Sequence, residues 1–374
     1  MLKSHQIHWN NKTLNYDLGR YDFTKWALKV VQEIHPSVNC FETIHKKFTP
    51  DEILKIQYYV QSAFLRKDWM ELIDSFAKEY AEPIIDNLPY LIQRQATMRV
   101  VIPNQAKENR KLIFHQGIFV GNGRGCRTFW NPLTEARDTN TMWILDLEDS
   151  RRITRQTILE KWSMKKFEEE SLKHAWPVNL SPGQSHLFFQ EHIHGNVNNN
   201  EGYTRASIDV RILLKGEEYG RRSPGGFFRI PGDYYTSQPI DLSDKKFISF
   251  VSWASEYGKN LSYPMQRSTI SRYCDMYKIK LSYEDGEFDN NDWHMMLEWY
   301  LQTCDADGIV LPSIHSLPDE YHRRNELLNL ALQQKIELHF ADEFLVMRND
   351  HDMEKINTYL TFAVRKKDPY VWEE

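Results

Sequence analysis

The sequence predicts an α+β protein of two domains, in which N-terminal helices support a β-sandwich or barrel and a small α/β domain with a mainly parallel sheet follows. Two observations carry this expectation. The chain has 374 residues, enough for two separate cores at roughly 150 residues per domain. Its apolar pattern also changes twice, first to short β-type runs after Leu88 and then to alternating strands and helices after Asp244.

The first segment, from Tyr21 to Ile85, has a helical period. A helix start is predicted at Thr49, because Thr can cap, Pro50 suits the first turn and Glu52 completes a capping box. Apolar residues in an earlier part of this segment recur at spacings of three and four: Phe23, Trp26, Ala27, Val30 and Val31. We expect a helical N-terminal layer.

The middle segment consists of short β-type runs separated by Gly, Asn and Pro clusters. Residues 153–175 are rich in charge and predict a surface helix that interrupts the runs. The richest turn cluster spans residues 220–226 and 231–233, which places the predicted domains at 1–235 and 240–374. The expected strands are 95–102, 112–120, 127–130, 141–147, 186–189 and 204–214.

The last segment alternates strand and helix patterns, which favours a small parallel sheet with crossover helices. The expected strands are 247–253, 308–312 and 337–341, and the expected helices are 263–277, 292–304, 318–335 and 352–362.

The composition excludes several classes of protein. With 47 basic and 52 acidic residues the formal charge is −5 and gives no field for a nucleic acid partner. No window approaches 18 consecutive apolar residues and no signal peptide pattern is present, so we expect no membrane association and a cytoplasmic location. The scattered cysteines are expected to be reduced thiols: Cys40, Cys126, Cys274 and Cys304.

Two histidines stand out by their context. His115 and His194 are 79 residues apart on separate predicted β segments, and neutral imidazoles from two strands can form the two-histidine part of an Fe(II) site. Arg205 follows His194 by 11 residues, and its guanidinium could bind a carboxylate with the Ser207 hydroxyl as a second donor. Taken singly, a histidine in a strand is more often packed or hydrogen-bonded than metal-bound.

Residues 90–211 resemble the Fe(II)/2-oxoglutarate oxygenases of the phytanoyl-hydroxylase type, most closely the branch found in bacterial sporadic carbohydrate clusters. The resemblance implies a double-stranded β-helix (jelly roll), a small polar, carbohydrate-related substrate, and the cofactors Fe(II), 2-oxoglutarate and O2. The segments that carry it are Arg99-Val-Val-Ile-Pro103, Phe114-His115-Gln116, Gly121-Asn122, residues 129–134, residues 141–144, His194-Gly195-Asn196 and residues 202–209.

By this resemblance His115 and His194 are the metal ligands, and Arg205, Ser207 and Arg99 bind 2-oxoglutarate. His192 is a rival to His194, since two residues' separation would put both on one side of a regular strand. The Gly-Asn pair after His194 fits the family pattern better.

Gly117 departs from the family pattern, which has an aspartate two residues after the first histidine. Three alternatives follow from the missing carboxylate. Chloride could take the vacated position, as in the halogenases of this superfamily, with Gly117 deciding what the substrate radical receives. Water or another acid could complete the iron shell of a hydroxylase, with Glu191, Asp146 and Glu148 as candidates. Loss of the ligand could instead leave a binding or scaffold protein without redox chemistry.

The C-terminal domain resembles a second family of the same carbohydrate clusters, whose members look like the catalytic domain of serine recombinases. Ser255 matches the nucleophile, but Trp253 occupies the position of an arginine, and no arginine is found at 313–316. Without guanidinium groups for phosphoryl transfer, DNA strand exchange is excluded. We expect a module for homodimer formation or scaffolding; a lid or second activity built on Ser255, His315 and Asp319 is the alternative.

Overall fold

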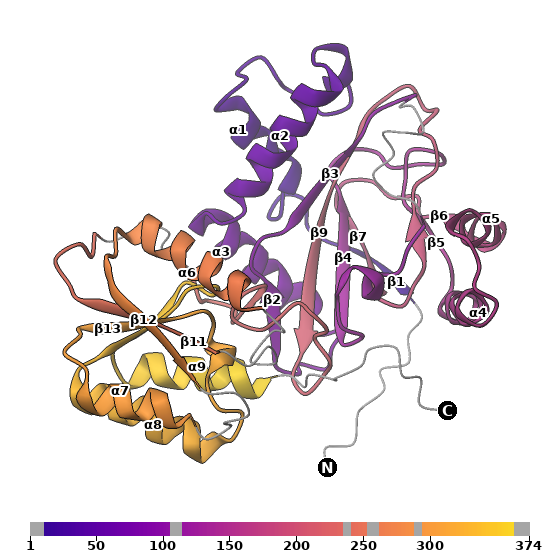
Figure 1. Ribbon diagram of the computed structural model, residues 1–374. Coiled ribbons are helices and arrows are strands. Elements are labelled where there is room, and N and C mark those ends of the chain that lie inside the picture. Colours follow the sequence, from indigo (N-terminus) through magenta and orange to yellow (C-terminus); the bar gives the residue numbers. More distant parts are fainter. Residues whose placement is uncertain (1–10, 105–113, 235–240, 253–261, 288–293, 363–374) are drawn as a thin grey trace. The chain divides into compact units, whose positions relative to one another are not determined.

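The computed structural model describes residues 11–104, 114–234, 241–252, 262–287 and 294–362, which form two compact units. The first unit contains residues 11–222 and 228–234, and the second contains residues 223–227 and 241–362. Figure 1 shows a mixed α+β protein, with antiparallel sheets in the first unit. None of the described helices combines the length and the apolar character needed to cross a membrane.

The N-terminal helices of the first unit are α1 (Phe23–Gln32), α2 (Pro50–Ala63) and α3 (Lys67–Phe76), with a short π-helical turn at Ala77–Ala81. The predicted start of α2 is confirmed. The Thr49 N–H donates to Glu52 Oε2 over 2.8 Å, the Glu52 N–H donates to Thr49 Oγ1 over 3.4 Å, and Pro50 occupies the first turn. The apolar faces of these helices pack against one face of the large sheet and form the main core of the unit.

The large sheet of the first unit has seven strands in the order β1-β7-β4-β9-β2-β10, with β3 also paired to β9. The strand pairs within it are antiparallel. Its strands are β1 (Asn11–Asn15), β2 (Tyr90–Gln93), β3 (Thr97–Val101), β4 (Cys126–Pro132), β7 (Gln184–Phe189), β9 (Arg205–Leu214) and β10 (Phe228–Arg229).

A small antiparallel sheet has the order β6-β5-β8, from β5 (Trp143–Ile144), β6 (Trp176–Pro177) and β8 (His194–Gly195). An isolated antiparallel bridge joins His115 to β8 at His194. The predicted strand at 112–120 is therefore wrong beyond this bridge, because Gly117–Val120 form a 3-10 helix; residues 112 and 113 lie outside the described residues. A cluster of apolar residues from β4, β5 and β7 lies between the two sheets.

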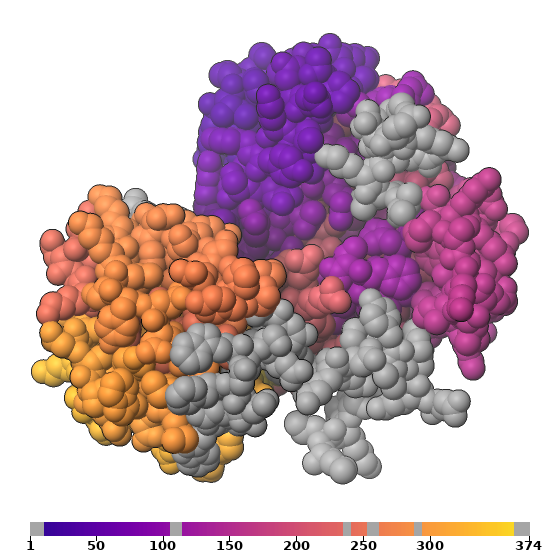
Figure 2. Space-filling model, viewed as in Figure 1, coloured from indigo at the N-terminus to yellow at the C-terminus, as the bar shows by residue number. Residues whose placement is uncertain are grey.

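The charged segment predicted as one helix at 153–175 is two helices, α4 (Leu147–Leu159) and α5 (Met164–His174). Lys161 has a positive φ of 51° and Ser163 caps α5 through Lys166 N, so the chain turns between them. Ile153 and Phe167 pack with Phe114 and Ile193, which anchors the pair to the small sheet. Figure 2 shows this pair, in magenta, at the surface of the first unit.

The second unit has a five-stranded sheet in the order β12-β11-β13-β14-β15, parallel except for the last pair. The mainly parallel sheet was predicted, but two of its strands were not. Its elements are β11 (Phe247–Ser252), α6 (Tyr263–Tyr277), β12 (Leu281–Glu287), α7 (Met295–Thr303), β13 (Gly308–Leu311), α8 (Tyr321–Gln334), β14 (Glu337–Phe340), β15 (Leu345–Met347) and α9 (Asp350–Phe362).

Candidate functional site

Strand β9 separates the helix-covered core from a polar interior. Its residues alternate, so every second side chain points to the same face of the sheet. The apolar set packs into the main core with the N-terminal helices: Ala206, Ile208, Val210 and Ile212. The opposite set is polar and largely buried: Arg205, Ser207, Asp209 and Arg211.

A pocket of about 360 Å³, including its opening to solvent, lies on the polar face of β9. Four residues predicted from the sequence line this pocket: His115, His194, Arg205 and Arg99. The fold therefore brings together side chains from four separate segments. The other lining residues are Trp130, Met142, Phe188, Gly195, Asn196, Asp209 and Arg211.

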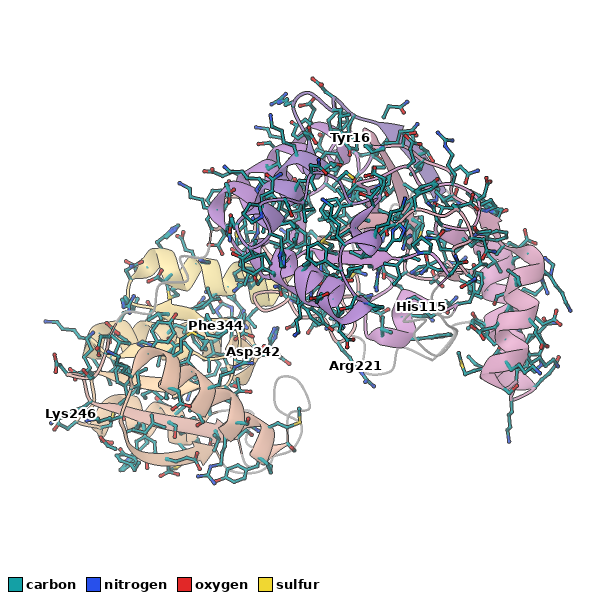
Figure 3. All side chains as sticks on the ribbon, turned by 90° about the horizontal axis from the view of Figure 1, so that it is seen from above. Tyr16, His115, Arg221, Lys246, Asp342 and Phe344 are labelled. Atoms are coloured by element: carbon teal, nitrogen blue, oxygen red, sulfur yellow. The ribbon has the colours of Figure 1, made fainter. Side chains whose placement is uncertain are left out.

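His115 and His194 are paired through their backbones and their rings. Each N–H donates to the carbonyl of the other residue over 2.9 Å, and the ring centroids are 4.5 Å apart with an interplanar angle of 48°. Figure 3 labels His115 in the first unit. A metal ion about 2.1 Å from one nitrogen of each ring, with bonds about 90° apart, needs centroids about 4.6 Å apart. The centroid separation is therefore compatible with a shared metal ion.

The backbone also fixes which nitrogen of His194 is available as a ligand. Its Nδ1 lies 2.9 Å from the carbonyl oxygen of His192, an acceptor, so Nδ1 carries the proton and Nε2 keeps its lone pair. Burial lowers the pKa of His194 well below its ordinary value, and the charge of a protonated His115 would lower it further. The ring is neutral at pH 7, as a metal ligand must be.

His192 does not share the position of His194. Residues 190–192 form a turn and not a regular strand, so the expectation that the two rings face one side is wrong. His192 is fully buried and stacks on Phe189, with its Nδ1 accepting the Phe189 N–H over 3.1 Å. It is absent from the pocket lining.

Arg205 and Ser207 carry buried donors that no described residue pairs with. Arg205 is 1% exposed, and its Nε and Nη2 have no hydrogen-bond partner among the described residues; the same is true of the Ser207 hydroxyl. Burial lowers the pKa of Arg205 to about 10, partly offset by the charge of Asp209. The guanidinium lies over the Trp130 ring at 5.5 Å. Since unpaired buried donors are costly, these groups fit a bound carboxylate.

Asp209 is the acidic residue in the described lining of the pocket, and it is not one of the acids that the sequence suggested as a third ligand. Arg99 Nε donates to Asp209 Oδ2 over 3.1 Å, and Arg211 Nη2 lies 3.9 Å from the same oxygen. The period-two pattern of Arg205, Ser207, Asp209 and Arg211 is the sequence signal that could have found it.

The acids named as replacement ligands lie elsewhere. Glu191 is buried and paired with Arg151 over 2.9 Å and with Arg124 over 3.9 Å. Asp146 and Glu148 are exposed at the start of α4, and none of the three lines the pocket. Within the described ranges, no group of three or more His, Cys, Asp or Glu side chains is arranged to hold a metal ion.

The space beside Gly117 is filled by a glutamine. A Cβ built on Gly117 would lie 1.9 Å from Gln190 Oε1. Gln190 is 1% exposed; its Oε1 accepts from Asn122 Nδ2 over 2.9 Å and its Nε2 donates to Thr128 Oγ1 over 2.6 Å. Gly117 is needed for this packing, and its predicted catalytic role stays a prediction.

The residues considered for a second activity have local roles where they are described. His315 Nε2 donates to the Pro224 carbonyl over 3.3 Å, and the Asp319 carbonyl accepts from Arg324 Nη1 over 3.0 Å. Ser255 and Trp253 lie outside the described residues.

No protein-family model matches the chain, and no curated protein matches it. Among solved structures, it is similar to SnoK, a non-heme alpha ketoglutarate dependent carbocyclase from nogalamycin biosynthesis, with a TM-score of 0.35 and 11% identity over 58% of this chain and 86% of that one. It is also similar to the epimerase SnoN in complex with Fe3+, alpha ketoglutarate and nogalamycin RO, with a TM-score of 0.33 and 11% identity over 56% of this chain and 81% of that one.

The N-terminal catalytic domain of TP901-1 integrase also matches, with a TM-score of 0.26 and 11% identity over 31% of this chain and 91% of that one. With TM-scores and identities this low, these likenesses do not by themselves assign a fold or an activity to this chain.

Proposed function

We propose that the first unit is an Fe(II)- and 2-oxoglutarate-dependent oxygenase built on a double-stranded β-helix. The strand order supports this fold. Along the chain, β3, β4, β7 and β9 belong to the large sheet, whereas the His115 bridge, β5, β6 and β8 belong to the small one. Apart from β5 and β6, which both lie in the small sheet, successive strands from β3 to β9 thus cross between two antiparallel sheets, as in a jelly roll.

The observation that carries the proposal is the shared pocket of the histidine pair and the unpaired donors of Arg205. His115 and His194 would hold the metal through neutral imidazoles, and Arg205 with Ser207 would hold the far carboxylate of 2-oxoglutarate. Iron with 2-oxoglutarate and O2 supplies the oxidising power to attack an unreactive C–H bond. Trp130, Met142 and Phe188 contribute apolar surface to the pocket lining.

Among the alternatives for the third ligand position, the packing favours an oxygenase with an unusual iron shell. A halogenase needs room for chloride where the aspartate side chain would project, and the Gln190 amide lies on that side of Gly117. A water molecule is then the simplest further ligand. Chloride as a cofactor and a scaffold protein without turnover are the remaining alternatives, and both are testable.

The substrate class follows only from the family resemblance: a small polar, carbohydrate-related metabolite. For the second unit we keep homodimer formation as the proposed role, which the mass of the intact chain in solution would test.

The deciding experiment measures iron and 2-oxoglutarate binding under argon, through the iron content of the protein and its charge-transfer absorption with 2-oxoglutarate. We expect about one Fe(II) per chain, lost in His115→Ala and in His194→Ala. His192→Ala is the matched control, since it removes a buried neighbouring ring but keeps the carbonyl that orients His194. Retention of iron in both ligand variants would disprove the assignment, and absence of both iron and 2-oxoglutarate binding would favour the scaffold alternative.

A further inference from the structure

The pocket carries more positive charge than 2-oxoglutarate needs. Its described lining has three arginines and one aspartate. This leaves two positive charges. Fe(II) would add two, and the 2-oxoglutarate dianion would cancel two, so the loaded site keeps an excess of two. Because unpaired charge in a buried site is costly, this excess indicates a further anionic ligand.

Arg211 is the cation best placed to bind this further anionic ligand. In the sheet register Arg211 pairs with Thr128 of β4, and Thr128 pairs with Phe188 of β7. The Phe188 ring lies 4.8 Å from the His194 ring, so Arg211 lies at the level of the histidine pair. Arg205 is six residues away on the same strand, about 20 Å in Cα position. The two guanidinium groups therefore serve different parts of the pocket.

The hydrogen bonds of Arg211 hold its guanidinium in place and leave one donor unpaired. Gln93 Oε1 accepts from both the N–H and the Nη1 of Arg211 over 3.1 Å. Nη2 lies 3.9 Å from Asp209 Oδ2, whose closer partner is Arg99. Nε is buried with no partner in the part of the chain that the structure describes. A guanidinium fixed in this way is suited to bind an oxyanion.

We propose that Arg211, beside the Arg99–Asp209 pair, forms a second anion subsite that binds the acidic group of the primary substrate next to the histidine pair. The substrate class is then an acidic small molecule with a carboxylate or phosphate group, such as a sugar acid or a sugar phosphate, and not a neutral sugar. This inference rests on the proposed function, because it assigns 2-oxoglutarate to Arg205.

The test titrates inorganic phosphate, and separately acetate, into protein loaded with Fe(II) and saturating 2-oxoglutarate under argon, with calorimetry as the readout. The better-bound probe distinguishes a phosphate from a carboxylate substrate. Arg211→Gln should weaken that binding about 10- to 100-fold while 2-oxoglutarate affinity changes less than about threefold. Arg205→Gln should weaken 2-oxoglutarate binding and change phosphate or acetate binding less than about threefold. Arg137→Gln, at an exposed position, should change neither affinity.

Asp209→Asn guards against a variant that simply misfolds. Removing this carboxylate deprives the arginines of their internal partner, so phosphate or acetate should bind more tightly, an effect that lost structure cannot produce. The inference is overturned if neither anion binds the loaded wild-type protein or if Arg211→Gln leaves their binding unchanged. The proposed function fails separately, if 2-oxoglutarate does not bind or if its binding ignores Arg205→Gln.

Discussion

Each unit contains buried polar side chains, but they are paired very differently. In the second unit the fully buried His339 lies 2.8 Å from the Tyr273 hydroxyl through Nδ1 and 2.9 Å from Glu337 Oε2 through Nε2. In the first unit the equally buried Arg205 has no hydrogen-bond partner for Nε or Nη2 within the described ranges of the chain. Pairing within the protein makes the first group structural, whereas the unpaired donors of the second group support the proposal that they bind a ligand.

The direction of the pKa shifts agrees with this difference. Burial alone raises the pKa of Glu337, but hydrogen bonds from His339, Lys245 and Arg348 outweigh it and lower the pKa. For Arg205, burial is the main effect and lowers the pKa to about 10. A bound carboxylate would supply the missing compensation, so ligand binding should stabilise the charged form of Arg205.

The largest expected effect tests this contrast directly. Arg205→Gln removes a charge-assisted pair to the ligand, so 2-oxoglutarate affinity should fall about 10- to 1,000-fold. Tyr273→Phe in the second unit is the matched control; it removes a buried hydrogen bond and should leave this affinity unchanged. Calorimetric titration of both variants checks the pair. An unchanged affinity in Arg205→Gln would move the anchor to Arg99 or Arg211.

The variant Gly117→Asp tests whether the first unit has a vacant metal-ligand position beside His115 and His194. The new side chain must displace the Gln190 amide from two buried hydrogen bonds, so we expect a loss of about 2–4 kcal/mol in the free energy of unfolding and no gain in iron affinity. Urea unfolding measures the loss, and Gln190→Ala in the same chain should recover part of it. Tighter iron binding with unchanged stability would instead show a vacated ligand position, as in the halogenase alternative.

Acid should destabilise the first unit through two buried rings. Burial lowers the pKa of His186 to about 3 and that of His192 to about 4, against about 6.5 in an unfolded chain. The contribution of the two neutral rings to the free energy of unfolding is present above pH 6.5, and it is lost as the pH falls from there towards these folded-state pKa values. Between pH 7.5 and 5 the loss should be about 2 kcal/mol per ring.

His186→Phe should remove about one proton from the pH dependence of unfolding, measured by urea titration at several pH values. The same slope in the variant would mean that His186 is charged in the folded protein. In the second unit burial also lowers the pKa of His339, but its hydrogen bond to Glu337 opposes the shift, so this ring should contribute less.

The smallest expected effect concerns the hydrogen bonds that Glu343 accepts in the second unit. Glu343 is fully buried and accepts from Ser313 Oγ over 2.6 Å and from Ile314 N over 3.0 Å. Glu343→Gln keeps one acceptor oxygen, so stability should fall by about 1–2 kcal/mol, seen as faster hydrogen exchange in β13 and β14. Iron and 2-oxoglutarate binding should stay the same; a change in either would contradict the separation of roles.

Local chemistry in the sequence determined much of the framework. Thr49, Pro50 and Glu52 specify the start of α2 through contacts within four residues, and they form as predicted. The alternation along β9 required Arg205 and Ser207 to share a face, because a strand has a period of two. Such features depend on neighbours in the chain, so the sequence alone suffices for them.

Tertiary structure decided the features that depend on distant partners. β12 escaped prediction because Leu281, Ser282 and Tyr283 are exposed on an edge strand, which needs no apolar alternation. The turn that removes His192 from the pocket and the Gln190 amide beside Gly117 also follow from long-range packing. A glycine in the sequence shows only that a side chain is missing. The atoms that fill the space beside it are determined when segments far apart in the chain pack together.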